Sequence, residues 1–168
     1  MANNVKGARL TTLVGLALIS ILPQAAQAAP TTLENVVDRL QIEDLEKQYY
    51  SELKGGSVQG IGAYFTENAT MVFNGNKVEG RAAIDKFYAS GGDRRVLPTN
   101  AYTMILSYMR TSVNGNTAVF DAIWTGYLCD NVKSTPRLVE QGTDRTVLEK
   151  QNGVWKISSR TVQHLGGG

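Results

Sequence analysis

The sequence predicts an α+β fold in which three helices precede a run of long antiparallel strands. Apolar residues recur at the helical spacings of three and four as far as Tyr88, whereas beyond Pro98 the chain becomes rich in Tyr, Ile, Met and Val. In this second region Asn114-Gly115-Asn116 is a strong hairpin turn, and Gln151-Asn152-Gly153 is another turn. A curved sheet folding over its own helices would enclose a pocket on its concave side.

The helices are predicted from apolar spacing and from the residues that begin or end them. Gly55-Gly56 ends the first helix, Ser57 can cap the second, and Gly91-Gly92 closes the third. The predicted helices are residues 33–53, 57–65 and 81–88. The predicted strands are a short one before the third helix and four long ones after it: 70–74, 101–113, 117–128, 137–149 and 154–164.

Residues 1–28 have the three zones of a secretory signal in the right order. Residues 1–9 carry only positive charge, residues 10–22 are apolar, and Ala26-Gln27-Ala28 fits an A-x-A cleavage site. The apolar run is shorter than the ~20 residues that span a membrane, which favours a cleaved signal over an anchor. We therefore expect one domain, residues 29–168, that is periplasmic or secreted and has no membrane contact after cleavage.

Composition excludes several classes of function. The whole chain has 17 basic and 15 acidic residues, and loss of Lys6 and Arg9 with the signal leaves 15 of each, so no basic footprint for nucleic acid is present. The single cysteine, Cys129, cannot form an internal disulfide. One histidine, no carboxylates at ligand spacing and no phosphate-binding glycine loop predict that there is no metal and no cofactor.

Three segments carry a family likeness: "GIGAYFTENATMVF", "NGNKVEGRAAIDKFY" and "NGVWKISSRTV". With the helix end around Tyr49, they resemble the SnoaL-like branch of the nuclear-transport-factor-2-like (NTF2-like) superfamily over nearly all of the mature chain. The resemblance implies a cone-shaped, bent antiparallel sheet wrapped around the helices, a deep apolar cavity, and a homodimer or homotrimer. The superfamily includes cofactor-free isomerases, dehydratases, cyclases and lyases, as well as binding modules without chemistry.

The same stretch is similar, without gaps, to the ketosteroid isomerases. Their oxyanion-hole tyrosine falls on Tyr49, but their catalytic aspartate falls on Phe73, which cannot accept a proton. Other SnoaL-like enzymes carry an aspartate where this chain has Lys54 and a histidine near Asn100. The resemblance therefore implies that this is not a ketosteroid isomerase and that the usual acid–base set is absent or relocated.

The candidate catalytic residues are Tyr49, Lys54, Asp121, Arg145 and His164. Tyr49 is either an oxyanion donor or a core tyrosine, and Lys54 is either a desolvated cation or a solvated lysine at a helix end. Asp121 lies in mid-strand and needs a partner such as Arg145 or Arg110. If that pair lies on the concave face of the sheet, it belongs to the site. The alternative is an ion pair on the outer face or at a subunit interface. His164, the only imidazole, either serves the site or lies on the surface.

The candidate substrate-binding residues are aromatic, sulfur-containing or amide side chains on the predicted helices, strands and connections. They are Tyr50, Phe73, Tyr88, Asn100, Tyr102, Met104, Tyr108 and Trp124. About half of the strand residues must face inward, because successive side chains of a strand point to opposite faces.

Two classes of function fit these residues. The first is an exported, cofactor-independent lyase or isomerase that acts by acid–base chemistry on a small, largely apolar, aromatic molecule. Deformylation or dehydration of a lignin-derived diaryl compound is one example, since the superfamily includes sphingomonad lyases that deformylate diarylpropanes. The alternative is a non-catalytic periplasmic binding module for a hydrophobic ligand or a protein partner. At least three converging polar groups with perturbed pKa values would favour the enzyme, and a purely apolar pocket would favour the carrier.

Overall fold

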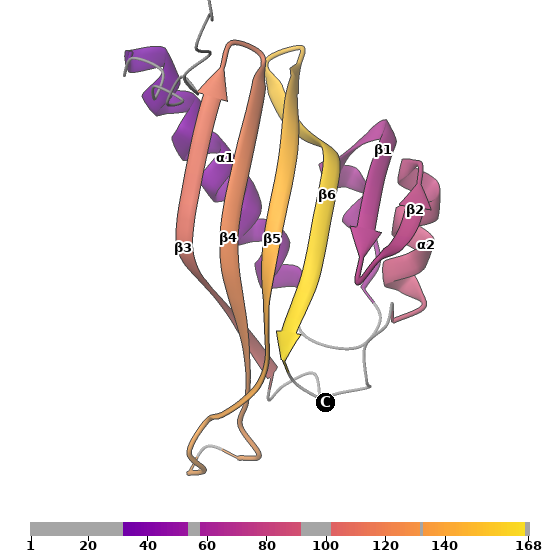
Figure 1. Cartoon of the computed structure of the whole chain (residues 1–168), viewed down its shortest axis with the longest axis vertical. Coiled ribbons are helices and arrows are strands. Elements are labelled where there is room, and N and C mark those ends of the chain that lie inside the picture. Colours follow the sequence, from indigo (N-terminus) through magenta and orange to yellow (C-terminus); the bar gives the residue numbers. More distant parts are fainter. Residues whose placement is uncertain (1–31, 54–57, 92–101, 132, 167–168) are drawn as a thin grey trace, which may run out of the picture.

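A computed structural model describes residues 32–53, 58–91, 102–131 and 133–166. Within these residues, two α-helices and one 3-10 helix accompany a six-stranded sheet in the order β2-β1-β6-β5-β4-β3 (Figure 1). The helices are α1 (Leu33–Glu52), η1 (Ile61–Tyr64) and α2 (Arg81–Ala89). The strands are β1 (Phe65–Phe73), β2 (Asn76–Glu79), β3 (Tyr102–Asn114), β4 (Thr117–Leu128), β5 (Arg137–Gln151) and β6 (Val154–Gly166).

The α+β class is confirmed, but the expectation of three N-terminal helices is wrong. The described part of the segment predicted as the second helix, residues 58–65, contains only the four-residue η1. Gly60, which precedes η1, has a left-handed φ of 81°, and β1 begins directly after η1 at Phe65. A segment this short, with glycine at its start, cannot offset the cost of nucleating an α-helix.

The sheet is mixed rather than purely antiparallel, which corrects a second expectation. β1 runs parallel to β6, and all the other neighbouring strands are antiparallel. A parallel pair needs a long connection, and here α2 and the β3–β5 strands lie between the two strands in sequence. The short strand β2 was not expected. It forms a hairpin with β1 through Asn74-Gly75, whose φ angles are 49° and 84°.

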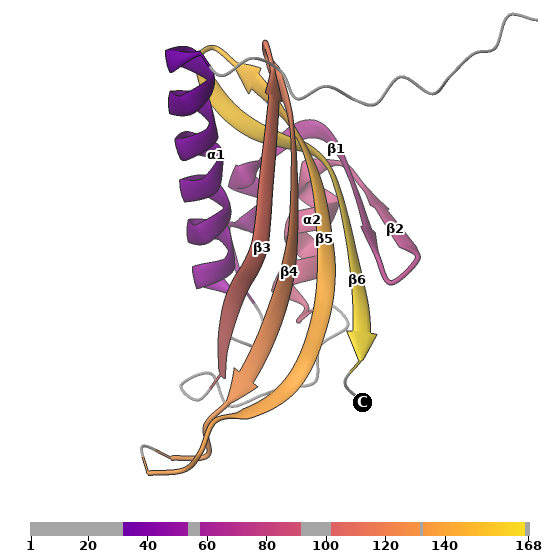
Figure 2. The ribbon, with the colours of Figure 1, turned by 60° about the vertical axis from the view of Figure 1, so that its left-hand side comes forward.

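The sheet bends around α1, which lies along its concave side (Figure 2). Even-numbered residues of β4 (Ala118, Phe120, Ala122 and Trp124) are buried, and they form the core with buried residues of α1 such as Ile42 and Tyr49. Leu33 and Leu40, by contrast, are exposed on α1. No helix among the described residues is long and apolar enough to cross a membrane.

Candidate functional site

A small pocket lies between the helices and the inner face of the sheet. Its wall combines aromatic and aliphatic side chains with several polar ones. The lining residues are Tyr49, Tyr50, Leu53, Phe73, Tyr88, Met104, Trp124, Glu140, Arg160, Val162 and His164. They come from α1 and the residue after it, from α2, and from five strands.

Two phenol groups meet on the helix side of the pocket. Tyr49 on α1 and Tyr88 on α2 are both buried, and their hydroxyls share a hydrogen bond. The Arg160 guanidinium carbon lies 3.9 Å from the centre of the Tyr49 ring. Burial raises the pKa of the Tyr49 phenol well above its usual value, although the Arg160 cation opposes this. The phenol therefore stays protonated at neutral pH and can donate a hydrogen bond.

Arg160 is the centre of a buried ionic cluster. Its Nη2 donates to Asp144 and, at 3.2 Å, to Glu46 Oε2, and all three side chains are fully buried. Asp144 also accepts hydrogen bonds from Tyr50 at 2.6 Å and from Thr146 at 3.0 Å. Burial lowers the pKa of Arg160, but the Asp144 and Glu46 carboxyl groups and the Tyr49 and Tyr50 phenols together offset this and hold it well above its usual value.

Glu46 is the weaker partner of that cation. Asp144 accepts three hydrogen bonds, whereas Glu46 Oε1 has no partner among the described residues. Burial raises the pKa of Glu46 from 4.5 to about 7, Arg160 opposes the rise, and the charge of Asp144 adds to it. One buried cation is balanced by one anion, and the second carboxyl takes up a proton near neutrality.

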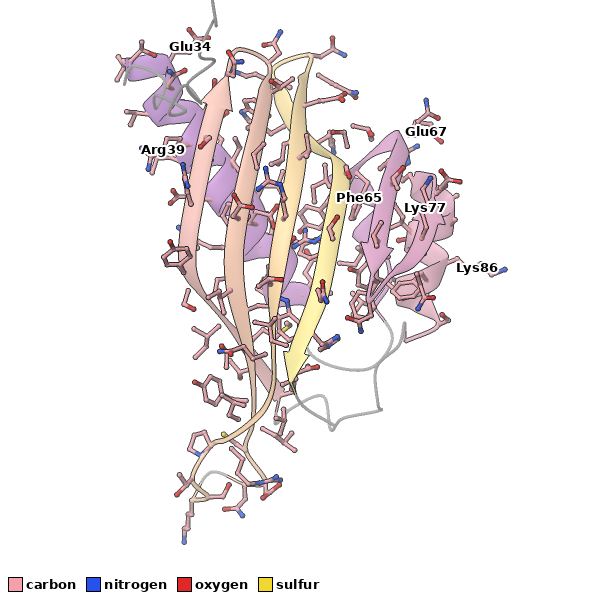
Figure 3. All side chains as sticks on the ribbon, viewed as in Figure 1. Glu34, Arg39, Phe65, Glu67, Lys77 and Lys86 are labelled. Carbon is pink, nitrogen blue, oxygen red and sulfur yellow. The ribbon has the colours of Figure 1, made fainter. Side chains whose placement is uncertain are left out.

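Glu46→Gln should therefore flatten the pH dependence of stability. Because the folded pKa is raised, the contribution of Glu46 is fully present below pH 4.5 and is lost as the pH rises through about 7. Between pH 5 and 8 the wild type should lose on the order of 2–3 kcal/mol more than the variant, as measured by urea unfolding. Glu34, which projects from the exposed end of α1 (Figure 3), supplies the control Glu34→Gln. Parallel curves for wild type and Glu46→Gln would contradict this assignment.

On the sheet side, His164 is held in one tautomer. Its backbone N–H donates to Asn74 Oδ1 at 2.9 Å, so the Asn74 amide nitrogen donates to His164 Nδ1 at 2.7 Å. Nδ1 is therefore an acceptor, and Nε2–H donates to Glu140 Oε2 at 3.0 Å. Tyr102 donates to the other oxygen of Glu140. The Glu140 carboxylate is thus fixed between two strands at the pocket wall.

Two glycines give the large side chains of this wall their space. A β-carbon on Gly142 would overlap the Trp124 ring and come within 2.5 Å of the Gln163 carbonyl oxygen. A β-carbon on Gly126 would lie 2.6 Å from the Tyr102 hydroxyl. The Trp124 indole can therefore extend across Gly142 to His164, where the ring centres are 4.8 Å apart.

Most of the predicted site residues lie together in the structure. Seven of them line the pocket: Tyr49, Tyr50, Phe73, Tyr88, Met104, Trp124 and His164. Tyr102 is buried and contacts the lining residue Glu140. Lys54 and Asn100 lie outside the described residues. The positions fit the predicted set, while the roles of these residues stay predictions.

Three candidates lie elsewhere, and their placement in the site is corrected. Asp121 and Arg145 form an ion pair of 2.7 Å, but their side chains are 37% and 62% exposed. They alternate with the buried residues of β4 and β5, which puts them on the outer face. Tyr108 is 79% exposed, because a bulge in β3, where its φ is 50°, interrupts the alternation that would have turned it inward.

Four polar residues of the site were not among the candidates: Glu46, Glu140, Asp144 and Arg160. A sequence signal existed for two of them. Glu140 and Asp144 share the parity of Leu148, which is the buried face of β5. Arg160 could be recognised only as one of several arginines on strands. Among the described residues, no three His, Cys, Asp or Glu side chains are grouped as metal ligands would be.

A family model of the SnoaL-like domain matches residues 34–161, and the chain therefore belongs to the SnoaL-like domain family. A search of curated proteins finds no match. An NTF2-like protein of Novosphingobium aromaticivorans, with a cystatin-like fold, is 22% identical with a TM-score of 0.65, over 79% of this chain and 85% of that one. A protein proposed to be a scytalone dehydratase, from the same organism, is 16% identical with a TM-score of 0.59, over 78% and 86%. A protein proposed to be an NTF2-like dehydratase, from Streptomyces avermitilis, is 14% identical with a TM-score of 0.60, over 78% and 98%. At these identities the likeness shows that the chain has the NTF2-like fold.

Proposed function

We propose that the mature chain is a cofactor-independent lyase or isomerase that acts by acid–base chemistry on a small, largely apolar, aromatic compound. The observation that carries this proposal is the pairing of two kinds of proton-transfer group in one aromatic pocket. The Tyr49–Tyr88 hydroxyl pair lies on the helix side, and the His164–Glu140 pair lies on the sheet side. The aromatic and aliphatic remainder of the wall suits a ring-containing ligand.

The phenol pair is the proposed acid. Tyr49 donates to the leaving oxygen of the substrate, and the hydrogen bond to Tyr88 allows the proton to be replaced from the second hydroxyl. Any negative charge that develops on Tyr49 is stabilised by the Arg160 guanidinium beneath its ring. The two arrangements together lower the barrier for a hydroxyl that must depart as water.

The Glu140 carboxylate is the proposed base, and His164 positions it. In a dehydration, Glu140 removes a proton from carbon, a C=C bond forms, and the hydroxyl leaves as water after protonation by Tyr49. In a deformylation of a diaryl diol, Glu140 removes the proton of the terminal hydroxyl. The adjacent C–C bond then breaks, formaldehyde leaves, the electron pair forms the C=C bond, and the benzylic hydroxyl departs as water. Neither reaction needs an oxidant or a reductant.

The names of two structural neighbours, both proposed to be dehydratases, support this class of reaction. A non-catalytic carrier is the second candidate, and the observation in its favour is Phe73, which lines the pocket where the related isomerases have their base. Pocket polarity favours the enzyme, since Tyr49, Tyr50 and Arg160 all line the pocket and all have raised pKa values.

Export to the periplasm and assembly as a homodimer or homotrimer belong to the same proposal. The supports are the signal-like residues 1–28 and the family membership. Protein recovered from the periplasm of an expression host should have the intact mass of a chain that begins at Ala29. Retention of residues 1–22 would contradict export. Light scattering of this preparation would measure the number of subunits in the assembly.

The experiment is an assay of that preparation against diaryl propane diols and hydroxylated aromatic compounds, with and without a carbonyl group, in the absence of added cofactor and with a chelator present. We expect a product lighter by water, or by water and formaldehyde, identified by mass spectrometry and formaldehyde trapping. A compound that raises the melting temperature and is recovered unchanged would identify a carrier instead.

A further inference from the structure

Two residues of the pocket wall carry buried hydrogen-bond donors that have no acceptor. The Trp124 indole nitrogen and the Nε and Nη1 atoms of Arg160 are inaccessible to solvent and have no hydrogen-bond partner among the described residues. Trp124 is 2% exposed and Arg160 fully buried, and both line the pocket. An unpaired buried donor costs roughly 1–3 kcal/mol, so native proteins rarely leave one without a purpose.

The second tryptophan of the chain shows the ordinary arrangement. Trp155 is 3% exposed, almost as buried as Trp124, but its indole nitrogen donates to Asp38 Oδ1 at 3.1 Å. The two indole N–H groups therefore differ in whether the protein supplies an acceptor. Because Trp124 lines the pocket, a molecule bound there is the candidate acceptor for its indole N–H.

The charges around the pocket indicate that this acceptor is neutral. Arg160 is already paired with Asp144 and Glu46. On the sheet side, the Glu140 carboxylate faces the pocket and is held by His164 and Tyr102. Among the described lining residues no cation is left without an anionic partner, so a negatively charged ligand would be repelled by Glu140 without a compensating attraction.

We infer that the ligand presents a neutral carbonyl oxygen to the Trp124 indole N–H, so that the pocket selects aromatic carbonyl compounds over hydrocarbons and carboxylates of the same shape. A carbonyl is a strong neutral acceptor, and its two lone pairs can accept from two donors of the wall. This inference deepens the proposed function, on whose pocket it rests, and it assigns a specificity-determining contact to Trp124.

The test compares three probes of similar size: acetophenone, ethylbenzene and benzoate. Their dissociation constants are measured by calorimetry for the wild type, Trp124→Phe and the matched control Trp155→Phe. Phenylalanine keeps an aromatic ring and removes the N–H. The result is expressed as the ethylbenzene dissociation constant divided by the acetophenone dissociation constant. Any packing that is lost with the indole affects both probes, so it cancels in this ratio. We expect this ratio to fall about tenfold in Trp124→Phe, the size of one hydrogen bond, and to stay within about twofold in Trp155→Phe.

A second measurement does not depend on whether Trp124→Phe folds. Trp155→Phe leaves Trp124 as the only tryptophan, so its single indole N–H resonance reports the pocket. Acetophenone should shift that resonance as a hydrogen bond forms, and ethylbenzene should not. The inference is overturned by an unchanged affinity ratio in Trp124→Phe, by an indole resonance that acetophenone does not move, or by tightest binding of benzoate. Failure of acetophenone to bind would overturn it as well. The proposed acid–base function is judged separately, by turnover.

Discussion

Tyr49→Phe should slow turnover by roughly 10²–10³ while the protein stays folded, because the change removes a single oxygen that stabilises charge in the transition state. The Tyr49 ring is held by the edges of neighbouring aromatic rings and by Arg160, and phenylalanine keeps those contacts. Loss of its hydrogen bond with Tyr88 should cost about 1 kcal/mol of stability. Melting temperature and turnover are measured on the same preparation, with a substrate found in the assay described above.

Tyr64→Phe is the matched control for that experiment. The Tyr64 ring packs against Tyr49, with ring centres 5.6 Å apart, but its hydroxyl donates to Glu52 at 2.6 Å and it is not part of the pocket wall. Its turnover should stay within about twofold of the wild type. A Tyr49→Phe protein with unchanged turnover would reduce Tyr49 to a core residue and would leave the proposed acid without support.

Arg160→Leu should lower the free energy of unfolding by roughly 3–5 kcal/mol at neutral pH, which is a large part of the stability of an ordinary domain. The leucine leaves Glu46 and Asp144 fully buried without a cation. Because buried carboxyl groups can escape this cost by taking up protons, the loss should shrink as the pH is lowered toward 5. Chemical unfolding at two pH values measures both effects.

Arg145→Leu controls for the loss of an arginine as such. Arg145 also forms an ion pair with an aspartate, but it does so on the outer face of the sheet with its side chain 62% exposed. Exposed pairs contribute about 0–1 kcal/mol, so this variant should melt close to the wild type. Adding Glu46→Gln and Asp144→Asn to Arg160→Leu should recover part of the lost stability. Equal effects of the two arginine variants would show that the buried cluster is not held together by charge.

The elements with strong periodicity were predictable from the sequence. The β4 strand has the predicted range, and α1, α2 and β3, β5 and β6 differ from prediction by one or two residues at their ends. Hydrophobic alternation and turn residues act locally, so they can be recognised in a single chain. The parallel pairing of β1 with β6 was not predictable in this way, because it depends on contacts between segments far apart in sequence.

The site was predictable where aromatic residues mark it and not where charged residues do. Tyr49, Tyr88 and Trp124 stand out as large aromatic side chains on predicted helices and strands, and all three line the pocket. A buried charge such as Arg160 looks like any surface arginine until its partners are known, since Glu46 lies 114 residues away along the chain. Asp121 is the opposite case. A charge in mid-strand would be costly if it were buried, but the Asp121 side chain lies on the outer face of the sheet.

Part of the pocket outline depends on the absence of a side chain at Gly142. A methyl group there would meet both the Trp124 ring and a main-chain oxygen of β6, and the main chain of an inner strand has little freedom to retreat. This side of the cavity therefore has little room to change by small steps. Changes in the compounds that related chains accept would come more readily from residue 124 itself or from the opposite wall, where Leu53 and Tyr88 are carried by separate segments. In evolutionary terms, one wall of the pocket is fixed by the backbone and the other is open to variation.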